Sequence, residues 1–228
     1  MNIYDDMRRI GIRVLRRKLE NSKISGLYIK HPVAGRCVLI NYSEDIYRQR
    51  FTAAHEAAHT ILDEEEDVLV SFTWEKNDLK EIRANSFASA YLIPPEVASK
   101  IPERHRWTQK KAIEWANKFK VSTQVLAIAL LENQLINRSI YSEITKAKAP
   151  KRHKEDPELS RNLSPRSKER KKMLLEHGLS DYYISLCFEA YRERIVSASR
   201  LVEMLLLETD YQLLEISELY GESIKYAS

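Results

Sequence analysis

The sequence has few glycines and prolines and contains no long apolar run. Its 228 residues include 5 Gly and 7 Pro, which excludes a collagen-like or low-complexity chain. The longest uncharged apolar stretches, 87–95 and 121–131, are much shorter than the roughly 20 residues that a bilayer requires. Residues 1–20 lack the apolar segment of about 7–15 residues found in secretory signals. We therefore expect a globular protein without a membrane span.

Cysteine is also scarce. The two cysteines, Cys37 and Cys187, are distant in the sequence, and neither has a second cysteine at the spacing of a metal site. Such sparse use is typical of proteins from a reducing compartment, so we expect a cytoplasmic protein.

Charge is unevenly distributed, although the net charge is only +4. Residues 146–172 contain 11 Lys or Arg, four acids and three prolines. This composition predicts a solvated basic linker, in preference to a surface for nucleic acid. The acidic run 63–67 follows a predicted helix, and we expect it to be an exposed loop.

Hydrophobic periodicity predicts an α+β fold that is mostly helical. Helices are predicted over 3–20, 50–62, 78–93, 108–119, 122–133, 164–177, 180–193, 197–207 and 211–220. Two β-type runs, 27–31 and 36–41, flank Pro32-Val33-Ala34-Gly35 and predict a hairpin in a small antiparallel sheet. The predicted organisation is a domain over 1–100, a helical region over 101–145, the basic linker over 146–172 and a C-terminal helical region over 173–228.

The clearest chemical signal is His55-Glu56-Ala57-Ala58-His59. Two histidines four residues apart on a helix lie one turn above the other and can bind one cation. Glu56 is rotated off that line, toward a water held by the cation, and is the candidate general base. A catalytic zinc site uses three protein ligands and one open position, so one ligand is still missing. By itself, the motif also fits an amphipathic helix with two ordinary histidines.

The predicted helix 78–93 offers the missing ligand. Glu81 and Asn85 lie four residues apart on it, and Glu81 is the candidate third ligand. Asn85 could accept a hydrogen bond from the non-ligating N–H of a metal-bound imidazole. Asp78 is the competing acid, but at the start of the helix it reads more naturally as an N-cap.

These residues resemble the ImmA/IrrE family of metallopeptidases. The resemblance rests on Arg50-Phe-Thr-Ala-Ala-His-Glu-Ala-Ala-His59 and on Glu81-Ile-Arg-Ala-Asn-Ser-Phe-Ala-Ser-Ala-Tyr-Leu-Ile-Pro94, and it covers about residues 5–136. The segment 116–122 is similar to the helix-turn-helix-like middle region of the family. In some members an acid at the position before Ala-Asn is a candidate ligand, but here that position holds Arg83, which cannot bind zinc. The resemblance therefore implies Glu81 as the ligand.

The resemblance implies a zincin-like metallopeptidase domain, followed by helix-turn-helix-like and C-terminal helical regions. It implies Zn²⁺, with Mn²⁺ as an alternative, held by His55, His59 and Glu81, while Glu56 activates a zinc-bound water. The resemblance implies an endopeptidase of bacterial, phage or mobile-element origin, whose substrate is a protein, a helix-turn-helix repressor. An oxyanion donor is also needed, and His31, Tyr91 and His105 are the candidates. The edge of the sheet near 37–41 could bind an extended substrate by strand addition.

A competing hypothesis is a DNA- or protein-binding regulator built on residues 108–133, with a structural or vestigial metal site. Against DNA binding, the would-be recognition helix 123–133 carries no Arg or Lys, although these residues make most contacts to phosphates and guanine. A third possibility, compatible with catalysis, is that the helical regions bind the substrate repressor or a sensor partner.

Overall fold

A computed structural model describes residues 2–19, 23–63, 68–72, 78–148, 150, 154–159 and 162–224. Residues 64–67 of the acidic run and Lys151, Arg152 and Arg161 of the basic segment lie outside the described residues. The chain divides into two compact units, Met1–Pro157 and Glu158–Ser228, and each is described by itself. Within the described part of the chain, no helix is both long and apolar enough to cross a bilayer.

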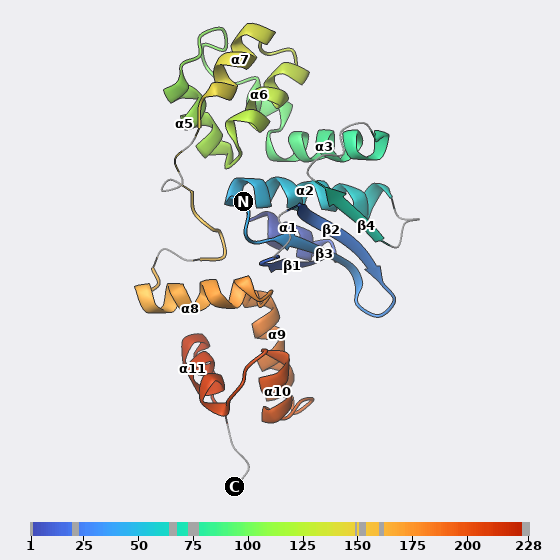
Figure 1. The fold of residues 1–228 in the computed structure, drawn as a ribbon, viewed down its shortest axis with the longest axis vertical. Coiled ribbons are helices and arrows are strands. Elements are labelled where there is room, and N and C mark those ends of the chain that lie inside the picture. Colours follow the sequence, from blue (N-terminus) through green and yellow to red (C-terminus); the bar gives the residue numbers. More distant parts are fainter. Residues whose placement is uncertain are drawn as a thin grey trace. The chain divides into compact units, whose positions relative to one another are not determined.

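The first unit contains a four-stranded mixed sheet (Figure 1). Its strands are β1 (Arg13–Arg17), β2 (Ile24–His31), β3 (Gly35–Asn41) and β4 (Val68–Phe72), in the order β1-β3-β2-β4. The predicted hairpin is confirmed as the antiparallel pair β2–β3, and Gly35 supplies the positive φ of +74° at its turn. The expectation of a purely antiparallel sheet is wrong, because β1 pairs in parallel with β3. The α+β class is confirmed.

The helix predicted over 3–20 is wrong in its second half. α1 (Ile3–Arg9) ends just before Gly11, whose φ is +83°, and the chain then continues as β1. In β1 the buried residues alternate with exposed ones, so Val14 and Arg16 point inward. This alternation is the period of a strand, and it replaces the helical period that the sequence suggested.

Helix α2 (Ile46–Leu62) packs on β2 and β3, and α3 (Leu79–Leu92) packs on α2 (Figure 1). Both helices have the capping residues that fix their starts: Asp45 accepts a hydrogen bond from the backbone of Tyr47, and Asp78 accepts one from that of Lys80. Alanines dominate the buried surface between α2 and α3: Ala54, Ala57, Ala58, Ala84 and Ala88. These small side chains allow the two helices to approach closely.

The described residues of the first unit form four further helices: α4 (Pro95–Ala98), α5 (Gln109–Phe119), α6 (Thr123–Glu132) and α7 (Arg138–Lys146). The predicted helices 108–119 and 122–133 are confirmed as α5 and α6, whereas β4, α4 and α7 were not predicted. Lys120 adopts the left-handed conformation between α5 and α6, with φ +56°. Leu126 and Leu130 of α6 are fully buried, and α6 packs against α3 and α7.

The second unit is helical, as predicted. Where the structure describes it, this unit forms α8 (Pro165–Glu176), α9 (Asp181–Arg192), α10 (Ala198–Met204) and α11 (Asp210–Tyr220). Its own apolar core includes Phe188, Leu201 and Leu213. The connection between α8 and α9 repeats that between α5 and α6: a left-handed residue, Gly178, is followed by a serine N-cap, Ser180.

Part of the predicted basic linker is folded onto the first unit. Asp156 makes a bidentate ion pair with Arg16, with N–O distances of 2.8 and 2.6 Å. The Arg16 guanidinium also donates to Gln49 and stacks over the rings of Tyr4 and Tyr42. The expectation of a solvated linker is therefore wrong for this segment, because a buried arginine on β1 requires its carboxylate.

Replacing Asp156 with Ala is expected to destabilise the first unit by about 1–3 kcal/mol. The substitution removes the bidentate carboxylate partner of the buried Arg16 guanidinium, and a buried charge that loses a hydrogen-bonding partner costs about that much. Chemical denaturation of the full chain, compared with Glu155→Ala next to it, measures the effect. Equal midpoints for the two variants would contradict the role of Asp156.

Candidate metal centre

Helices α2 and α3 bring three ligand atoms together. His55 and His59 project from α2, and Glu81 projects from the first turn of α3. The Nε2 atoms of the two histidines are 3.1 Å apart, and each lies 3.2 Å from a carboxylate oxygen of Glu81. The three side chains are largely shielded from solvent.

These separations suit a divalent cation. Zinc takes nitrogen and oxygen ligands at about 2.0–2.2 Å in a tetrahedral arrangement, which places neighbouring ligand atoms roughly 3.3 Å apart. Imidazole nitrogens and a carboxylate that converge on one point are electron-pair donors, and they repel each other unless a cation or a proton lies between them. The donor set therefore fits a metal such as zinc.

In both imidazoles, the Nδ1 atom, which is not the nitrogen beside Glu81, is hydrogen-bonded. Nδ1 of His55 lies 3.1 Å from Oδ1 of Asn85, and Nδ1 of His59 lies 2.8 Å from Oδ2 of Asp63. Since both oxygens accept, each Nδ1 carries the proton, and each Nε2 keeps its lone pair for the side facing Glu81. The structure thus places Asn85 beside His55, one of the candidate ligands.

Asp63 was not predicted to take part in the site. The sequence suggested an exposed loop for 63–67, but Asp63 is buried at the end of α2 and also pairs with Arg83 of α3. The expectation is wrong for this residue because Asp63 follows His59 by four positions, which places it one helical turn further on the same face. That spacing is the signal that would have identified it.

Replacing Asp63 with Ala is expected to weaken metal binding about 10–100-fold. The change removes the acceptor that fixes the tautomer and orientation of His59, and such outer hydrogen bonds carry an effect of that size. Competition with a chromophoric chelator measures the affinity. An Asp45→Ala variant, which removes the cap at the other end of α2, serves as the control and should bind as tightly as the unsubstituted protein.

Glu56 lies on a different face of α2 from the two histidines. It is fully buried, faces β2, and lies close enough to His59 for its charge to raise the pKa of that imidazole. Asp78, the alternative third ligand, is exposed and caps α3 instead. The candidate ligand set therefore remains His55, His59 and Glu81.

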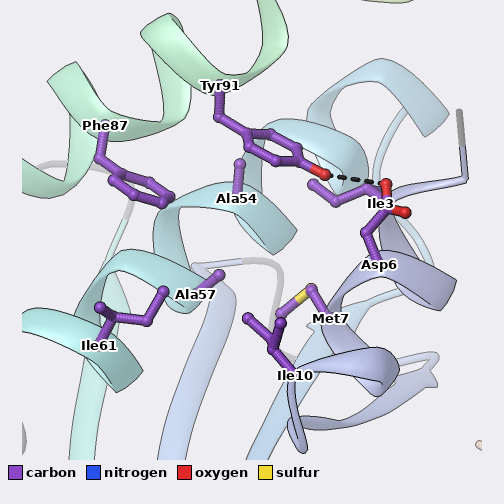
Figure 2. A pocket seen from close by; sticks show the side chains of 9 residues that line it. All are labelled: Ile3, Asp6, Met7, Ile10, Ala54, Ala57, Ile61, Phe87 and Tyr91. Atoms are coloured by element: carbon purple, nitrogen blue, oxygen red, sulfur yellow. Dashed lines mark hydrogen bonds between the residues drawn. The ribbon is translucent and has the colours of Figure 1, made fainter.

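Two of the three candidate oxyanion donors are engaged elsewhere. The hydroxyl of Tyr91 donates to Asp6 at 2.9 Å, in an apolar cavity of about 140 Å³ between α1, α2 and α3 (Figure 2). The residues of α2 that line this cavity, Ala54, Ala57 and Ile61, lie on the face roughly opposite the two histidines. Nδ1 of His31 accepts hydrogen bonds from the backbone of the β2–β3 turn. His105 is exposed.

The proposed substrate edge near 37–41 is wrong. These residues belong to β3, which lies between β1 and β2, so its backbone already pairs on both sides. In the described sheet the outer strands are β1 and β4. An extended peptide that adds to this sheet would have to pair with one of them.

The charges of the site shift two pKa values in opposite directions. Burial acts to raise the pKa of Glu81, but hydrogen bonds from His55 and His59 outweigh it and lower the pKa to about 2. Burial acts to lower the pKa of His59, but hydrogen bonds to Glu81 and Asp63 outweigh it and raise the pKa. Without a metal, the site therefore favours a carboxylate paired with a protonated imidazole.

The metal-free protein is expected to gain most stability from this pair between about pH 4.5 and 6.5. The contribution of Glu81 is present above its ordinary pKa of 4.5 and is lost as the pH falls toward 2. The contribution of His59 is present below its ordinary pKa of 6.5 and is lost as the pH rises through its raised pKa. Thermal unfolding in a chelator across this range measures the effect, and Glu81→Gln should flatten the profile.

Comparison with known proteins finds a matching family model and a similar protein. Residues 7–131, more than half of the chain, match the peptidase family M78 model, described as an IrrE N-terminal-like domain. The radiation response metalloprotease IrrE of Deinococcus radiodurans is 32% identical over 119 residues, which cover 50% of this chain and 36% of that relative. The chain thus matches only about a third of the relative's length.

Proposed function

Because this chain belongs to the ImmA/IrrE family of metallopeptidases, we propose that it is a metal-dependent endopeptidase that cleaves a helix-turn-helix repressor. The observation that carries the proposal is the convergence of His55, His59 and Glu81, with Glu56 beside them on α2. Zinc is the metal that this donor set favours, with manganese as the alternative.

Each residue of the site has a separate task. When bound, zinc supplies Lewis acidity, which polarises the peptide carbonyl and makes a water molecule more acidic. His55, His59 and Glu81 would hold the metal, while Asn85 and Asp63 keep the two imidazoles in the ligating tautomer. The Glu56 carboxylate would accept the proton of the attacking water and deliver it to the leaving amine.

The repressor substrate rests on the family resemblance, and the helical parts of the chain offer surfaces for its recognition. The first unit carries α5–α7 beside the catalytic helices, and the second unit is a helical body with its own core. We place the reaction in the cytoplasm, where the free thiols of Cys37 and Cys187 would remain reduced.

The competing function is a DNA- or protein-binding regulator with a structural or vestigial metal site. The burial of α6 counts against its DNA-binding form, since Leu126 and Leu130 place this helix in the core and its sequence lacks basic residues. Salt-dependent gel-shift assays with duplex DNA discriminate between the two functions. A peptidase of this kind should show no such binding.

The direct test uses the metal-loaded full chain and purified helix-turn-helix repressors, beginning with any encoded beside its gene. Gel electrophoresis and mass spectrometry of the fragments would reveal a cut at a defined bond that a chelator prevents and that added zinc restores. Intact metal binding with no cleavage of any repressor, together with salt-dependent DNA binding, would favour the regulator.

A further inference from the structure

Gly26 of β2 lies directly against the catalytic helix. A Cβ atom built on Gly26 would lie 2.5 Å from Cγ2 of Thr52, 2.8 Å from Oε1 of Glu56 and 3.1 Å from Cγ of Glu56. Carbon atoms in van der Waals contact are about 3.5–4.0 Å apart. The strand and the helix therefore approach so closely here that no side chain fits between them.

Space, and not backbone conformation, is what requires glycine at this position. The glycines with positive φ are Gly11, Gly35, Gly178 and Gly221, so Gly26 has a backbone that other residues can adopt. The pairing of β2 with β4 shifts register between Ile24 and Gly26. Such irregularities of a strand are frequent next to active sites.

The neighbours of Gly26 have little freedom to move aside. Thr52 is 5% exposed, and as a β-branched residue on a helix it has few rotamers. Glu56 is 0% exposed, so its carboxylate has no solvent into which it could retreat. An added methyl group must therefore displace the Glu56 carboxylate or lift α2 from the sheet.

We propose that Gly26 is a positioning residue for Glu56. Because Gly26 has no side chain, the Glu56 carboxylate is held in the space beside the strand that a Cβ atom would otherwise fill. The steric part of this inference is independent of catalysis. Only its consequence for cleavage rests on the proposed function, in which Glu56 is the general base.

The test adds the methyl group with and without the Glu56 side chain. Thr52→Ser, which removes Cγ2, is the common background, so that the atoms of Glu56 become the nearest ones to the methyl group of Gly26→Ala. The four full-length proteins are Thr52→Ser, Thr52→Ser with Gly26→Ala, Thr52→Ser with Glu56→Ala, and the triple variant. Thermal unfolding without metal, and zinc content after loading, are measured for each.

With Glu56 present, Gly26→Ala is expected to lower the Tm by about 3–10 °C, because overpacking a buried contact has a cost of that order. With Glu56→Ala, the same methyl group occupies vacated space, and the loss should shrink to less than half. Zinc content should stay near one per chain in all four proteins. An equal loss of Tm in both backgrounds, or failure to fold in both, would overturn the proposal.

Cleavage gives the functional readout on a repressor substrate. In the Thr52→Ser background, Gly26→Ala is expected to lower kcat on the order of 10²-fold with zinc retained, since a misplacement of about 1 Å can cost that much. If Gly26→Ala lowered the Tm only when Glu56 is present but left kcat unchanged, the positioning role would be overturned. If Glu56→Gln proved fully active, the general-base role of Glu56 in the proposed function would fail, while the Tm values of the four proteins would still decide the steric inference.

Discussion

Replacing Glu56 with Gln is expected to slow cleavage by about 10²–10⁴-fold, the contribution of a positioned general base. The amide has the size of the carboxylate and can still hydrogen-bond, but it cannot take a proton from water at neutral pH. Glu56 is not among the three ligands, so zinc content should remain near one per chain. Elemental analysis and repressor cleavage on the same preparation measure both quantities.

The matched control is Glu96→Gln, the same chemical change on an exposed residue of α4. It should keep full activity, which separates a specific loss from damage caused by an added amide. An active Glu56→Gln protein would remove the general-base assignment. Loss of both zinc and activity would instead give Glu56 a part in holding the metal.

Replacing Glu81 with Ala is expected to reduce the metal content from about one per chain to below one tenth after desalting. Glu81 supplies the only carboxylate among the three converging ligands, and its oxygens lie 3.2 Å from both imidazole Nε2 atoms. Two neutral imidazoles would have to hold the cation alone. The loss of affinity should exceed the roughly 10–100-fold that removal of an outer hydrogen bond causes, and elemental analysis measures it.

Asp78→Asn is the control for this experiment. Asp78 is three residues from Glu81 and can also ligate a metal, but it caps α3, and asparagine caps a helix equally well. The Asp78→Asn protein should therefore keep its metal. The opposite result, full metal in Glu81→Ala and loss in Asp78→Asn, would identify Asp78 as the third ligand.

Most of what the sequence predicted correctly depends on interactions within one helix or one hairpin. The helices predicted to start at 78, 108 and 122 start within a residue of those positions, each after an N-capping side chain: Asp78, Thr108 and Ser122. The spacing of His55 and His59 implied one helical face, because the period of 3.6 residues is intrinsic to the helix. The same rule placed Glu81 and Asn85 on one face of their helix.

The errors concern segments whose structure depends on distant partners. Residues 13–17 form β1 because β3 pairs with them in parallel, and the apolar period of residues 3–20 carries no sign of that partner. Similarly, β3 was taken for an edge strand because the sequence shows its hairpin with β2 but not its pairing with β1. The segment around Asp156 was taken for a solvated linker because its partner, Arg16, lies 140 positions away.

The sequence by itself determined the elements that carry the candidate ligands, because helical spacing and capping act over a few residues. The tertiary structure decided how those elements meet: that Asp63 pairs with Arg83, and that Gly26 lies against Glu56. The first contact joins residues 20 positions apart, and the second joins residues 30 positions apart. They depend on how closely α2 packs on β2 and α3, and packing distances between elements are not encoded in the period of any one of them.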